Sequence, residues 1–314
     1  MFDELIPRSG LSLDRLHNFL LVAEAGSIAK AAPDSPVRQS QISRQIRELE
    51  EFFKAELTQR HGKTLILTVA GKNLAKRIYL GLTDLDDFRK EQSEAKRTFT
   101  LGAGASILDW LVIPVIGSVR NALDEAIIRF DTRRSEALVE GVRYGEIDFA
   151  IVREDAIAPK LPRLPLLRLK FYLCVPRCLV KRGKTANAIN DPSLWKTLPF
   201  TAGIDGGQFD RTLRQAMEQA VGKFQPIIEC NSMLQIRQII ERGVCAGILP
   251  SVGIQGLCHK EILISEFALL KNYGRPLALH WNERQMGRRG VQKRVIEQIA
   301  AAIKSCTPFN SKQI

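Results

Sequence analysis

The spacing of apolar residues changes near residue 98, and this change restricts the chain to folds with two different parts. Up to residue 97 the apolar residues mostly recur at steps of three and four, the spacing of amphipathic helices. From residue 98 on, short apolar runs alternate with helical patterns. Such alternation is typical of an α/β fold in which helices cover both faces of a mostly parallel sheet. The 314 residues are therefore expected to form a small helical domain followed by a larger α/β domain.

The chain is basic, but the surplus of positive charge lies outside the helical part. Lys and Arg exceed Asp and Glu by 12, which favours polyanionic partners such as nucleic acid. Residues 1–97 hold 16 basic and 14 acidic residues, whereas residues 98–314 hold 30 and 20. Net charge therefore does not locate a nucleic-acid-binding surface, and local patterns have to do so.

The sequence gives no sign of a membrane segment or an export signal. No apolar run reaches the ~18–20 residues of a membrane-spanning helix, and the first ten residues, MFDELIPRSG, lack the apolar core of a secretory signal. We therefore expect a cytoplasmic protein without a membrane partner. The cysteines at positions 174, 178, 230, 245, 258 and 306 form no CxxC pair and are expected to be reduced.

The first 70 residues predict three short helices and a hairpin. An apolar face beginning at Leu13 predicts a first helix that ends near Gly26, and Ser27 is placed to cap a second helix that Pro33 ends. A third helix is predicted to begin around Gln39 and Ser40. After it, the alternating segment TLILT (64–68) predicts a strand that pairs with the preceding residues through a turn at 61–63. This order is that of a winged helix-turn-helix, at residues 11–70.

The face of the third helix opposite its apolar residues carries Gln, Ser and Arg. These side chains reach base edges and phosphates when a helix lies in the major groove of double-stranded DNA. Spacing alone equally allows a solvated face that binds nothing. The candidate DNA-binding residues, with one from the second helix and one from the wing, are Ser27, Gln39, Ser40, Gln41, Ser43, Arg44, Arg47 and Lys63.

Several motifs at matching separations resemble the LysR-type transcriptional regulators. The segments LDRLHNFLLVAEAGSIAKAA (13–32), RQSQISRQIRELE (38–50) and GKTLILTVAG (62–71) are similar to the DNA-binding domain of that family. The segment at 145–148 and the run from Gly243 to Pro250 are similar to its most recognisable effector-domain stretches. The resemblance covers about residues 11–253. It implies a double-stranded DNA partner, a linker helix that dimerises, and a periplasmic-binding-protein-like effector domain of two α/β subdomains.

The chain departs from the family pattern within the predicted DNA-binding domain. Ser35 stands where the family has an apolar residue, next to Pro36, and Thr58 stands where it has an aromatic residue. Lys54 stands where it has glycine. Losing a buried Leu-sized side chain costs roughly 1.5–3 kcal/mol, and a non-glycine residue at a left-handed helix end costs about 1 kcal/mol. These departures predict a domain that is less stable than is typical, or one that is repacked around Phe52 and Phe53.

A long linker helix is predicted at residues 71–97, with Thr68 as its cap and an extent from about Val69 to Lys96. A lone helix cannot bury an apolar stripe, so this helix needs a partner. The partner is either the chain's own DNA-binding domain or, as the resemblance implies, the same helix of a second subunit in a homodimer or a dimer of dimers. The candidate dimerisation residues are Leu74, Ile78, Leu82 and Leu85.

Residues 98–305 are predicted to form the effector domain, and its polar strand ends are the candidate effector-binding residues. Ligands in such folds bind at the carboxyl ends of strands, where helix N-termini supply free N–H donors. By position, the resemblance places effector contacts on Ser106, Thr132 and Thr201. Each of these residues is equally able to cap a helix with no ligand. The candidate effector-binding residues are Ser106, Thr132, Arg133, Thr201 and Asn231. Arg133 and the adjacent Arg134 suit a carboxylate or phosphate and so lean toward an anionic effector, although a solvated strand end explains them equally well.

The sequence contains no pattern of an enzyme. The glycine-rich segment at 100–106 lacks the third glycine of a dinucleotide-binding fingerprint, because Ile107 stands in its place. The histidines at 17, 61, 259 and 280 are scattered, so we expect no catalytic residues, no metal and no cofactor. The predicted function is a transcriptional regulator controlled by a small polar or anionic effector. The alternative is a cytosolic small-molecule-binding protein or enzyme whose DNA-binding head is degenerate.

Overall fold

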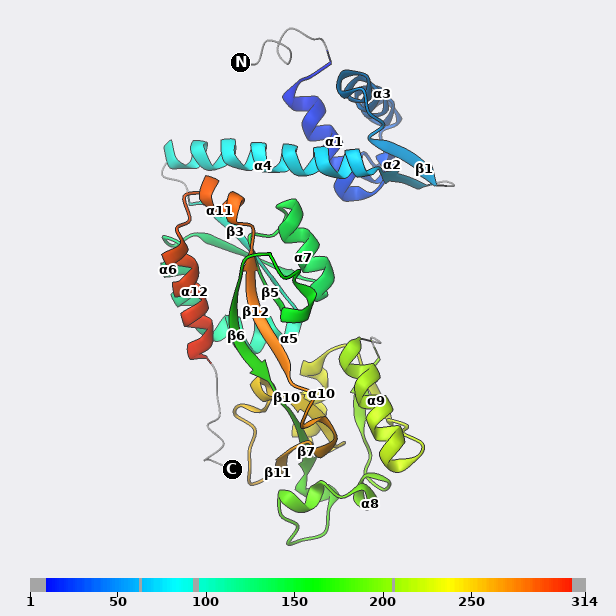
Figure 1. Cartoon of the computed structure of the whole chain (residues 1–314). Helices are drawn as coiled ribbons and strands as arrows, with labels where there is room; N and C mark the ends of the chain where they lie inside the picture. Colours follow the sequence, from blue (N-terminus) through cyan, green and yellow to red (C-terminus); the bar gives the residue numbers. More distant parts are fainter. Residues whose placement is uncertain (1–9, 62–63, 93–95, 205–206, 307–314) are drawn as a thin grey trace. The chain divides into compact units, whose positions relative to one another are not determined.

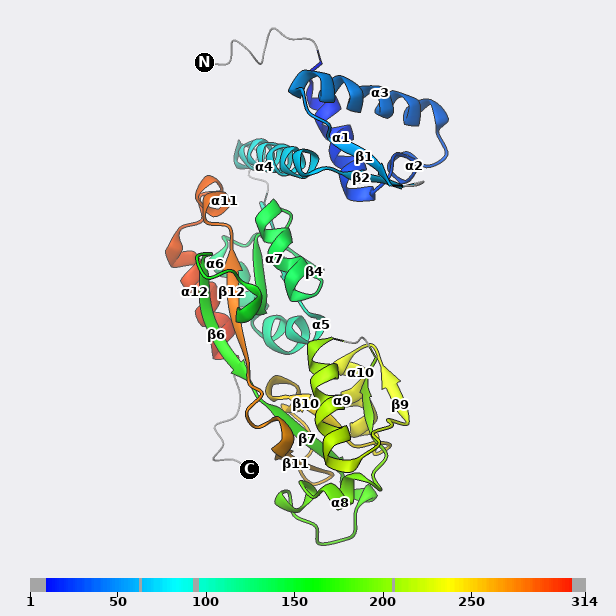
Figure 2. The same cartoon turned by 45° about the vertical axis from the view of Figure 1, so that its right-hand side comes forward.

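The computed structural model describes residues 10–61, 64–92, 96–204 and 207–306, which fold into two compact units (Figures 1 and 2). One unit contains the chain up to Arg97 together with two short segments from later in the sequence, Arg143–Glu146 and Gly287–Gly290. The other unit contains Thr98–Val142, Ile147–Met286 and the chain from Val291 on.

The N-terminal unit is the predicted winged helix-turn-helix followed by a long helix. Its helices surround a core that includes Phe19, Ile42 and Leu49, all fully buried. Strands β1 and β2 pair antiparallel, with Thr58 opposite Leu67. The elements are α1 (Leu13–Ala25), α2 (Ile28–Ala31), α3 (Pro36–Phe53), β1 (Thr58–His61), β2 (Thr64–Leu67) and α4 (Val69–Gln92).

Helix α3 begins earlier than the sequence pattern predicts. Ser35 is its N-cap, because the Ser35 hydroxyl accepts a hydrogen bond from the backbone N of Arg38 at 3.4 Å, and Pro36 is the first helical residue. Proline suits that position, since its fixed φ is helical and its missing N–H would have no partner there. The predicted start at Gln39 and Ser40 was therefore wrong. Ser35 replaces a usual apolar contact by a cap worth about 1 kcal/mol.

The other two departures from the family pattern also have local structural consequences. Lys54 ends α3 in the left-handed region with φ 51°, as the sequence comparison predicts for that position. The Thr58 hydroxyl donates to Oε1 of Glu50 at 3.1 Å, and the same oxygen accepts from the backbone N of Leu57 and Thr58. Phe53 packs against the core, with its ring edge-on to that of Phe52. Thr58 thus makes hydrogen bonds to Glu50 at the position where the family usually has an aromatic side chain.

Helix α4 is joined tightly to the wing. The Thr68 hydroxyl accepts from the backbone N of Gly71 at 3.0 Å, which confirms the predicted cap, and donates to the carbonyl of Glu56 at 2.6 Å. A Cβ on Gly71 would lie 2.0 Å from the carbonyl oxygen of Leu57, so only glycine fits there. The helix ends at Gln92 rather than at the predicted Lys96, which is not helical.

The second unit contains a five-stranded mixed sheet in the order β4–β3–β5–β12–β6. Strand β3 is parallel to β4 and β5, whereas β12 is antiparallel to β5 and β6. The prediction of a mostly parallel sheet holds for the first three strands only, because the C-terminal strand β12 returns between β5 and β6. The strands are β3 (Thr98–Ala103), β4 (Ile127–Thr132), β5 (Phe149–Arg153), β6 (Arg163–Leu169) and β12 (Arg275–Trp281).

The remaining strands of this unit form a second lobe, which the chain enters after Leu169 and leaves before Arg275. Strands β10, β7 and β11 are antiparallel, and β8 and β9 form a separate parallel pair. Lys170 alone separates β6 in the first lobe from β7 in the second. The strands are β7 (Phe171–Pro176), β8 (Thr201–Gly203), β9 (Ile228–Cys230), β10 (Gly247–Pro250) and β11 (Ile262–Glu266).

Helices cover the faces of these sheets, with α6 and α12 together on one side of the five-stranded sheet and α7 on the other (Figures 1 and 2). The predicted helix after β3 is an irregular helical segment, with a π-helical turn at Leu108–Val112 and a 3-10 turn at Ile113–Val115. The α-helices are α5 (Ala105–Ile107), α6 (Ile116–Ala122), α7 (Ser135–Tyr144), α8 (Pro192–Trp195), α9 (Gln208–Val221), α10 (Met233–Glu241), α11 (Glu283–Arg288) and α12 (Lys293–Ser305).

Candidate DNA-binding and effector sites

One face of α3 exposes polar and basic side chains along its length. Ser40, Gln41, Arg44 and Arg47 are exposed, while Ile42 and Ile46 on the opposite side are buried in the core. Arg44 donates to Glu48 at 3.0 Å, yet its side chain stays 82% exposed. Arg47 has no ion-pair partner among the described residues. Four of the predicted DNA-binding residues therefore form one accessible surface.

Other predicted DNA-binding residues have structural contacts of their own. Nε2 of Gln39 donates to the carbonyl of Ala32 at 2.9 Å and so ties α3 to the end of α2. The hydroxyl of Ser27 accepts from the backbone N of Lys30 at 3.2 Å, as expected of a cap. Ser43 is half-buried. Lys63 lies outside the described residues.

An apolar residue on the exposed face of α3 escaped the sequence reasoning. Val37 is 80% exposed and lies one helical turn before Gln41 and two turns before Arg44. An apolar side chain on a major-groove helix contacts the methyl group of thymine. The signal was present in the sequence, but it depended on α3 beginning at Pro36, three residues earlier than predicted.

The apolar stripe of α4 divides into two halves. Leu74, Ile78 and Leu82 pack against the core of the chain's own N-terminal unit, and Ile78 is only 6% exposed. Leu85 and Phe88, further along the helix, are 58% and 61% exposed. The sequence allowed two partners for this stripe, the chain's own N-terminal domain and a second subunit. The first half of the stripe packs on the N-terminal domain, and the second half is available to a second subunit. The exposed half remains without a partner in a single described chain.

The second unit contains a cavity of about 670 Å³ at the carboxyl ends of β3 and β5 and at the start of β12. The first lobe contributes the turn after β3 and the N-terminal end of α7. The second lobe contributes the N-terminal ends of α9 and α10, at residues 207–211 and 231–233. Helix N-termini therefore border the cavity from both lobes, and the first N–H groups of a helix have no partner within the helix itself.

The structure brings three of the five predicted effector residues to this cavity. Ser106, Arg133 and Asn231 line it, whereas Thr132 and Thr201 do not. Thr132 is exposed at the end of β4, the edge strand of the sheet. Thr201 is 1% exposed, and its hydroxyl lies 3.6 Å from the sulfur of Cys230 inside the second lobe. A strand end fixes the height of a residue in the sheet but not the side to which its side chain points.

The cavity is lined by more basic than acidic side chains. Arg133, Arg134, Arg153, Arg211 and Arg275 face it together with three carboxylates, those of Glu136, Asp155 and Asp210. Some of these charges are already paired: Arg133 lies 2.8 Å from Asp131, and Arg153 contacts Glu136 and Asp155. Among the described residues, neither Arg211 nor Arg275 has a carboxylate within ion-pair distance.

Arg275 lies at the point where the chain re-enters the first lobe, and Tyr273 holds its side chain there. Its guanidinium lies over the ring of Tyr273, 6.0 Å from the centroid, and donates to the Tyr273 hydroxyl at 3.1 Å. Its Nε is buried and has no hydrogen-bond partner among the described residues. Tyr273 in turn packs near Phe171 and Phe209, two stacked aromatic rings at the cavity wall. Sequence reasoning missed this arginine because it lies at the start of a strand rather than at its carboxyl end.

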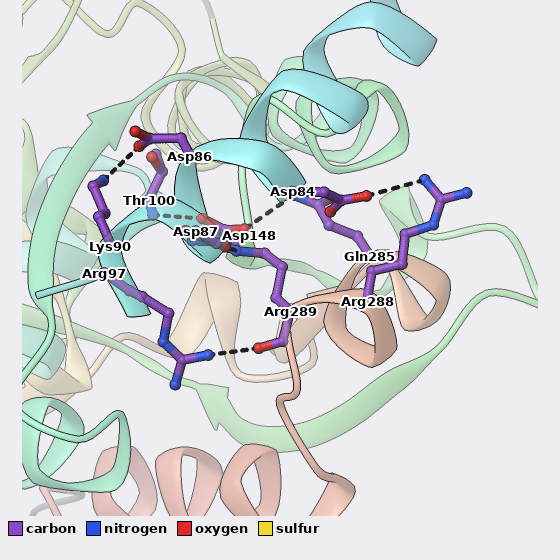
Figure 3. A network of polar contacts seen from close by, with 10 residues as sticks. All are labelled: Asp84, Asp86, Asp87, Lys90, Arg97, Thr100, Asp148, Gln285, Arg288 and Arg289. Carbon is purple, nitrogen blue, oxygen red and sulfur yellow. Dashed lines mark hydrogen bonds and ion pairs between the residues drawn. The ribbon is translucent and has the colours of Figure 1, made fainter. Parts of the chain in front are cut away.

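A polar network at the opposite end of the same strands holds Asp148 (Figure 3). The carboxylate of Asp148 accepts from the backbone N of Thr100 at 2.8 Å and from Nε2 of Gln285 at 3.0 Å. Asp148 and Gln285 are 5% and 3% exposed. Asp148 therefore joins β3, β5 and α11, which accounts physically for an acid in the segment Gly145–Asp148.

No side-chain arrangement in the part of the chain that the structure describes points to metal binding, since no group of three or more His, Cys, Asp or Glu residues there could hold an ion. Nor does any described helix combine the length and the apolar character needed to cross a membrane. Burial raises the pKa of the Cys174 thiol, which favours the unreactive neutral form.

A winged helix-turn-helix with an exposed polar recognition face, followed by a two-lobed domain around a cavity, defines a ligand-controlled DNA-binding protein. Two family models match: the LysR substrate binding domain at residues 92–302 and the bacterial regulatory helix-turn-helix protein, lysR family, at residues 13–72. The chain belongs to the LysR family of transcriptional regulators, and its larger domain is the effector-binding domain of that family.

Individual relatives agree with this assignment over nearly the whole chain. The nitrogen assimilation regulatory protein nac of Klebsiella aerogenes is 21% identical over 309 residues, which are 97% of this chain and 99% of that protein. The solved structure of full-length CbnR complexed with its target DNA has a TM-score of 0.58 at 18% identity, covering 94% of this chain and all of CbnR. Full-length LysG from Corynebacterium glutamicum with bound effector Arg has a TM-score of 0.59 at 16% identity, covering 94% and 99%.

Proposed function

We propose that this regulator binds a small anionic effector in the cavity between the lobes of its effector domain. The observation that carries the proposal is the pair Arg211 and Arg275, two guanidinium groups that line the cavity without a carboxylate partner in the described chain. Arg211 is exposed at the cavity, whereas Nε of Arg275 is buried without a hydrogen-bond partner among the described residues. A buried cation is stabilised when a counter-charge reaches it, and a carboxylate matches the two-donor fork of arginine.

Ser106 and Asn231 complete the proposed site from opposite lobes. Ser106 belongs to the segment after β3, and Asn231 precedes Ser232, the N-cap of α10. A small anion between them would accept hydrogen bonds from both side chains and from nearby backbone N–H groups. Such a ligand binds best when the lobes lie at one particular separation, so it favours one arrangement of the domain over others. This bias is the proposed source of regulation.

In the head, we propose that α3 reads DNA through its exposed face. Gln41 and Ser40 have the chemistry of base readout, Val37 offers an apolar contact to thymine, and Arg44 and Arg47 suit phosphates or guanine. Gln39 and Ser27 are proposed to act by holding α2 and α3 in place. We further propose that residues 11–70, 71–97 and 98–305 act as head, linker and sensor. We also propose a cytoplasmic location, which a DNA partner supports, and we propose neither a catalytic role nor a cofactor.

The effector site is tested with a thermal-shift screen of small carboxylates, followed by calorimetric titration of those that bind. Arg275→Met and Ser106→Ala should each weaken binding by roughly 10- to 150-fold, or about 1.5–3 kcal/mol, because a ligand charge loses a donor. Thr132→Ala and Thr201→Val serve as matched controls, since these hydroxyls lie outside the cavity. Unchanged affinity in both cavity variants would place the effector elsewhere.

A further inference from the structure

Three strands of the effector domain reach the cavity at one end and a single buried carboxylate at the other. Residues 104–106 follow β3 at the cavity, residues 151–153 end β5 there, and Arg275 and Leu277 of β12 line it. At the opposite end Asp148 precedes β5, binds the backbone of β3 through Thr100, and binds α11 through Gln285 (Figure 3). Since β12 leads into α11, this helix is joined covalently to β12 and, through Asp148, by hydrogen bonds to β3 and β5, the strands whose other ends border the cavity.

The segment Gly287–Gly290 forms a tight turn that begins with Gly287 and Arg288, the last two residues of α11. The backbone N of Val291 donates to the carbonyl of Met286 at 2.9 Å and closes the turn, and Gly290 adopts φ +66° within it. Met286 and Val291 are 1% and 8% exposed in the core of the effector domain. Both ends of the turn are therefore anchored, so a shift of α11 moves the whole turn with it.

The turn itself belongs to the N-terminal unit through Arg289. Nε and Nη2 of Arg289 donate to the two carboxylate oxygens of Asp87 on α4, at 2.6 and 3.1 Å (Figure 3). The side chains of Arg289 and Asp87 are 3% and 9% exposed. Nη1 of Arg97 adds a hydrogen bond of 2.7 Å to the carbonyl of Arg289. The turn is thus fixed to the linker helix by a buried, two-donor ion pair.

A buried ion pair of this kind is a poor source of net stability, because both charges lose their hydration and an apolar pair often serves as well. The best-attested role of such pairs is to fix register or to act as a switch. The planar fork of Arg289 holds the carboxylate in one geometry, unlike a sliding apolar contact. Asp87 and Arg289 are therefore suited to transmit position.

We propose that Asp87 and Arg289 are positioning residues that couple the state of the effector domain to the DNA-binding head through α4. An effector that shifts β3, β5 or β12 shifts α11 and its turn, and the ion pair makes α4 follow. The proposal rests on the proposed function in taking the cavity as the effector site. Because linkage is reciprocal, DNA bound to the head must also alter the effector domain.

This reciprocity gives a test that needs no knowledge of the effector. The full-length protein first selects a duplex from random-sequence DNA, and amide hydrogen exchange is then measured with and without that duplex at saturation. In the wild type, amides of α11 and of the start of β5 should exchange about tenfold more slowly with DNA bound, within the range of two-site coupling. In Asp87→Asn and Arg289→Gln this change should fall below about twofold while the duplex stays bound.

Three further variants make the result specific. Arg288→Gln is the matched control, because Arg288 is 56% exposed and lies 3.8 Å from Asp84, and this variant should respond as the wild type does. Arg289→Lys keeps the charge without the fork and should give an intermediate response. The double variant Asp87→Asn/Arg289→Gln should respond no less than either single variant, since all three remove one interaction.

A wild-type-like response in folded Arg289→Gln, or an equal loss in Arg288→Gln, would overturn the proposal. Far-ultraviolet circular dichroism and retained duplex binding establish folding, and if Arg289→Gln does not fold, Asp87→Asn and Arg289→Lys decide the question. Because the readout uses DNA and no effector, failure of the proposed effector site and failure of this coupling are seen separately.

Discussion

The side-chain amide of Gln39 donates to the carbonyl of Ala32 at 2.9 Å, so a residue of the recognition helix also holds that helix against α2. Ala32 is the C-cap of α2, and its carbonyl would otherwise be one of the unsatisfied acceptors at a helix end. A substitution at Gln39 therefore changes the shape of the head as well as its surface. A loss of DNA affinity on substitution of Gln39 therefore reports a change in the packing of α3 on α2, whereas a loss at the exposed Gln41 reports a lost contact with DNA.

We predict that Gln41→Ala weakens binding to the selected duplex by about 1–3 kcal/mol and leaves binding to random DNA nearly unchanged, because an exposed amide on this face contacts base edges. Gln39→Ala should weaken both alike. Gel shifts on the two DNAs separate these outcomes. An equal loss for Gln41→Ala on both DNAs would show that Gln41 contacts only the backbone.

For Arg47→Ala we predict a uniform loss on all sequences, because its exposed guanidinium has no protein partner in the described chain and suits a phosphate. The slope of log affinity against log salt should fall by about one charge. Fluorescence anisotropy at several salt concentrations measures this slope. A loss confined to the selected duplex would instead assign Arg47 to base readout.

Lys54→Gly should stabilise the head, because a Cβ at φ 51° costs about 1 kcal/mol that glycine avoids. Amides in α3 of the full-length protein should then exchange about fivefold more slowly. Lys54→Ala, which keeps the Cβ, is the control and should show no such change. If both variants slow exchange equally, the lysine charge and not the backbone is responsible.

The exposed half of the α4 stripe should hold subunits together. Leu85→Asp and Phe88→Asp are predicted to yield monomers with a folded head, because both side chains are more than half exposed in a single chain. Ile78→Asp should instead unfold the head, because its side chain lies in the core. Sedimentation combined with circular dichroism distinguishes dissociation from unfolding. An intact oligomer in both exposed-site variants would remove this surface from the interface.

Stability should fall as the solution becomes acidic, partly through His280. Burial lowers the pKa of His280 below its ordinary value, and nearby Arg163 adds to this effect, against an opposing contribution from the carbonyl of Pro162 at 2.6 Å. The unfolded state therefore binds a proton first, so this stabilisation is complete above pH ~6.5 and is lost as the pH falls toward the folded-state pKa. His280→Asn should flatten urea unfolding midpoints across this window. An unchanged pH profile would show that other groups dominate.

The helix boundaries of the DNA-binding head were largely predictable because the sequence signals for them are local. Ser27, Gly26 and Thr68 act at fixed distances from the helices they end or begin, and the structure confirms each. The start of α3 was missed because the proline at 36 reads as a helix breaker until Ser35 is recognised as a cap. The family resemblance predicted the presence of both domains, but it did not predict the orientation of any side chain.

The effector site was less predictable because it depends on contacts between distant segments. Ser106 and Asn231 lie at strand ends that the alternating pattern indicates, and both line the cavity. Thr201 has the same local signal, yet its hydroxyl points toward Cys230 inside the lobe. Arg275 lines the cavity only because β12 pairs between β5 and β6 in the sheet. No residue near position 275 indicates that pairing in the sequence.

The glycine contact between α4 and the wing joins the head and the linker helix into one rigid unit. Gly71 fits against the carbonyl of Leu57, and Leu74, Ile78 and Leu82 continue the same packing, so α4 has no hinge at its start. Asp87 lies 18 residues along this helix, or about 27 Å at 1.5 Å per residue. By that geometry, a sideways displacement of ~3 Å at Asp87 rotates the whole head by about 6°. Under the proposed mode of DNA binding, a small motion at Asp87 changes the angle at which α3 enters a groove.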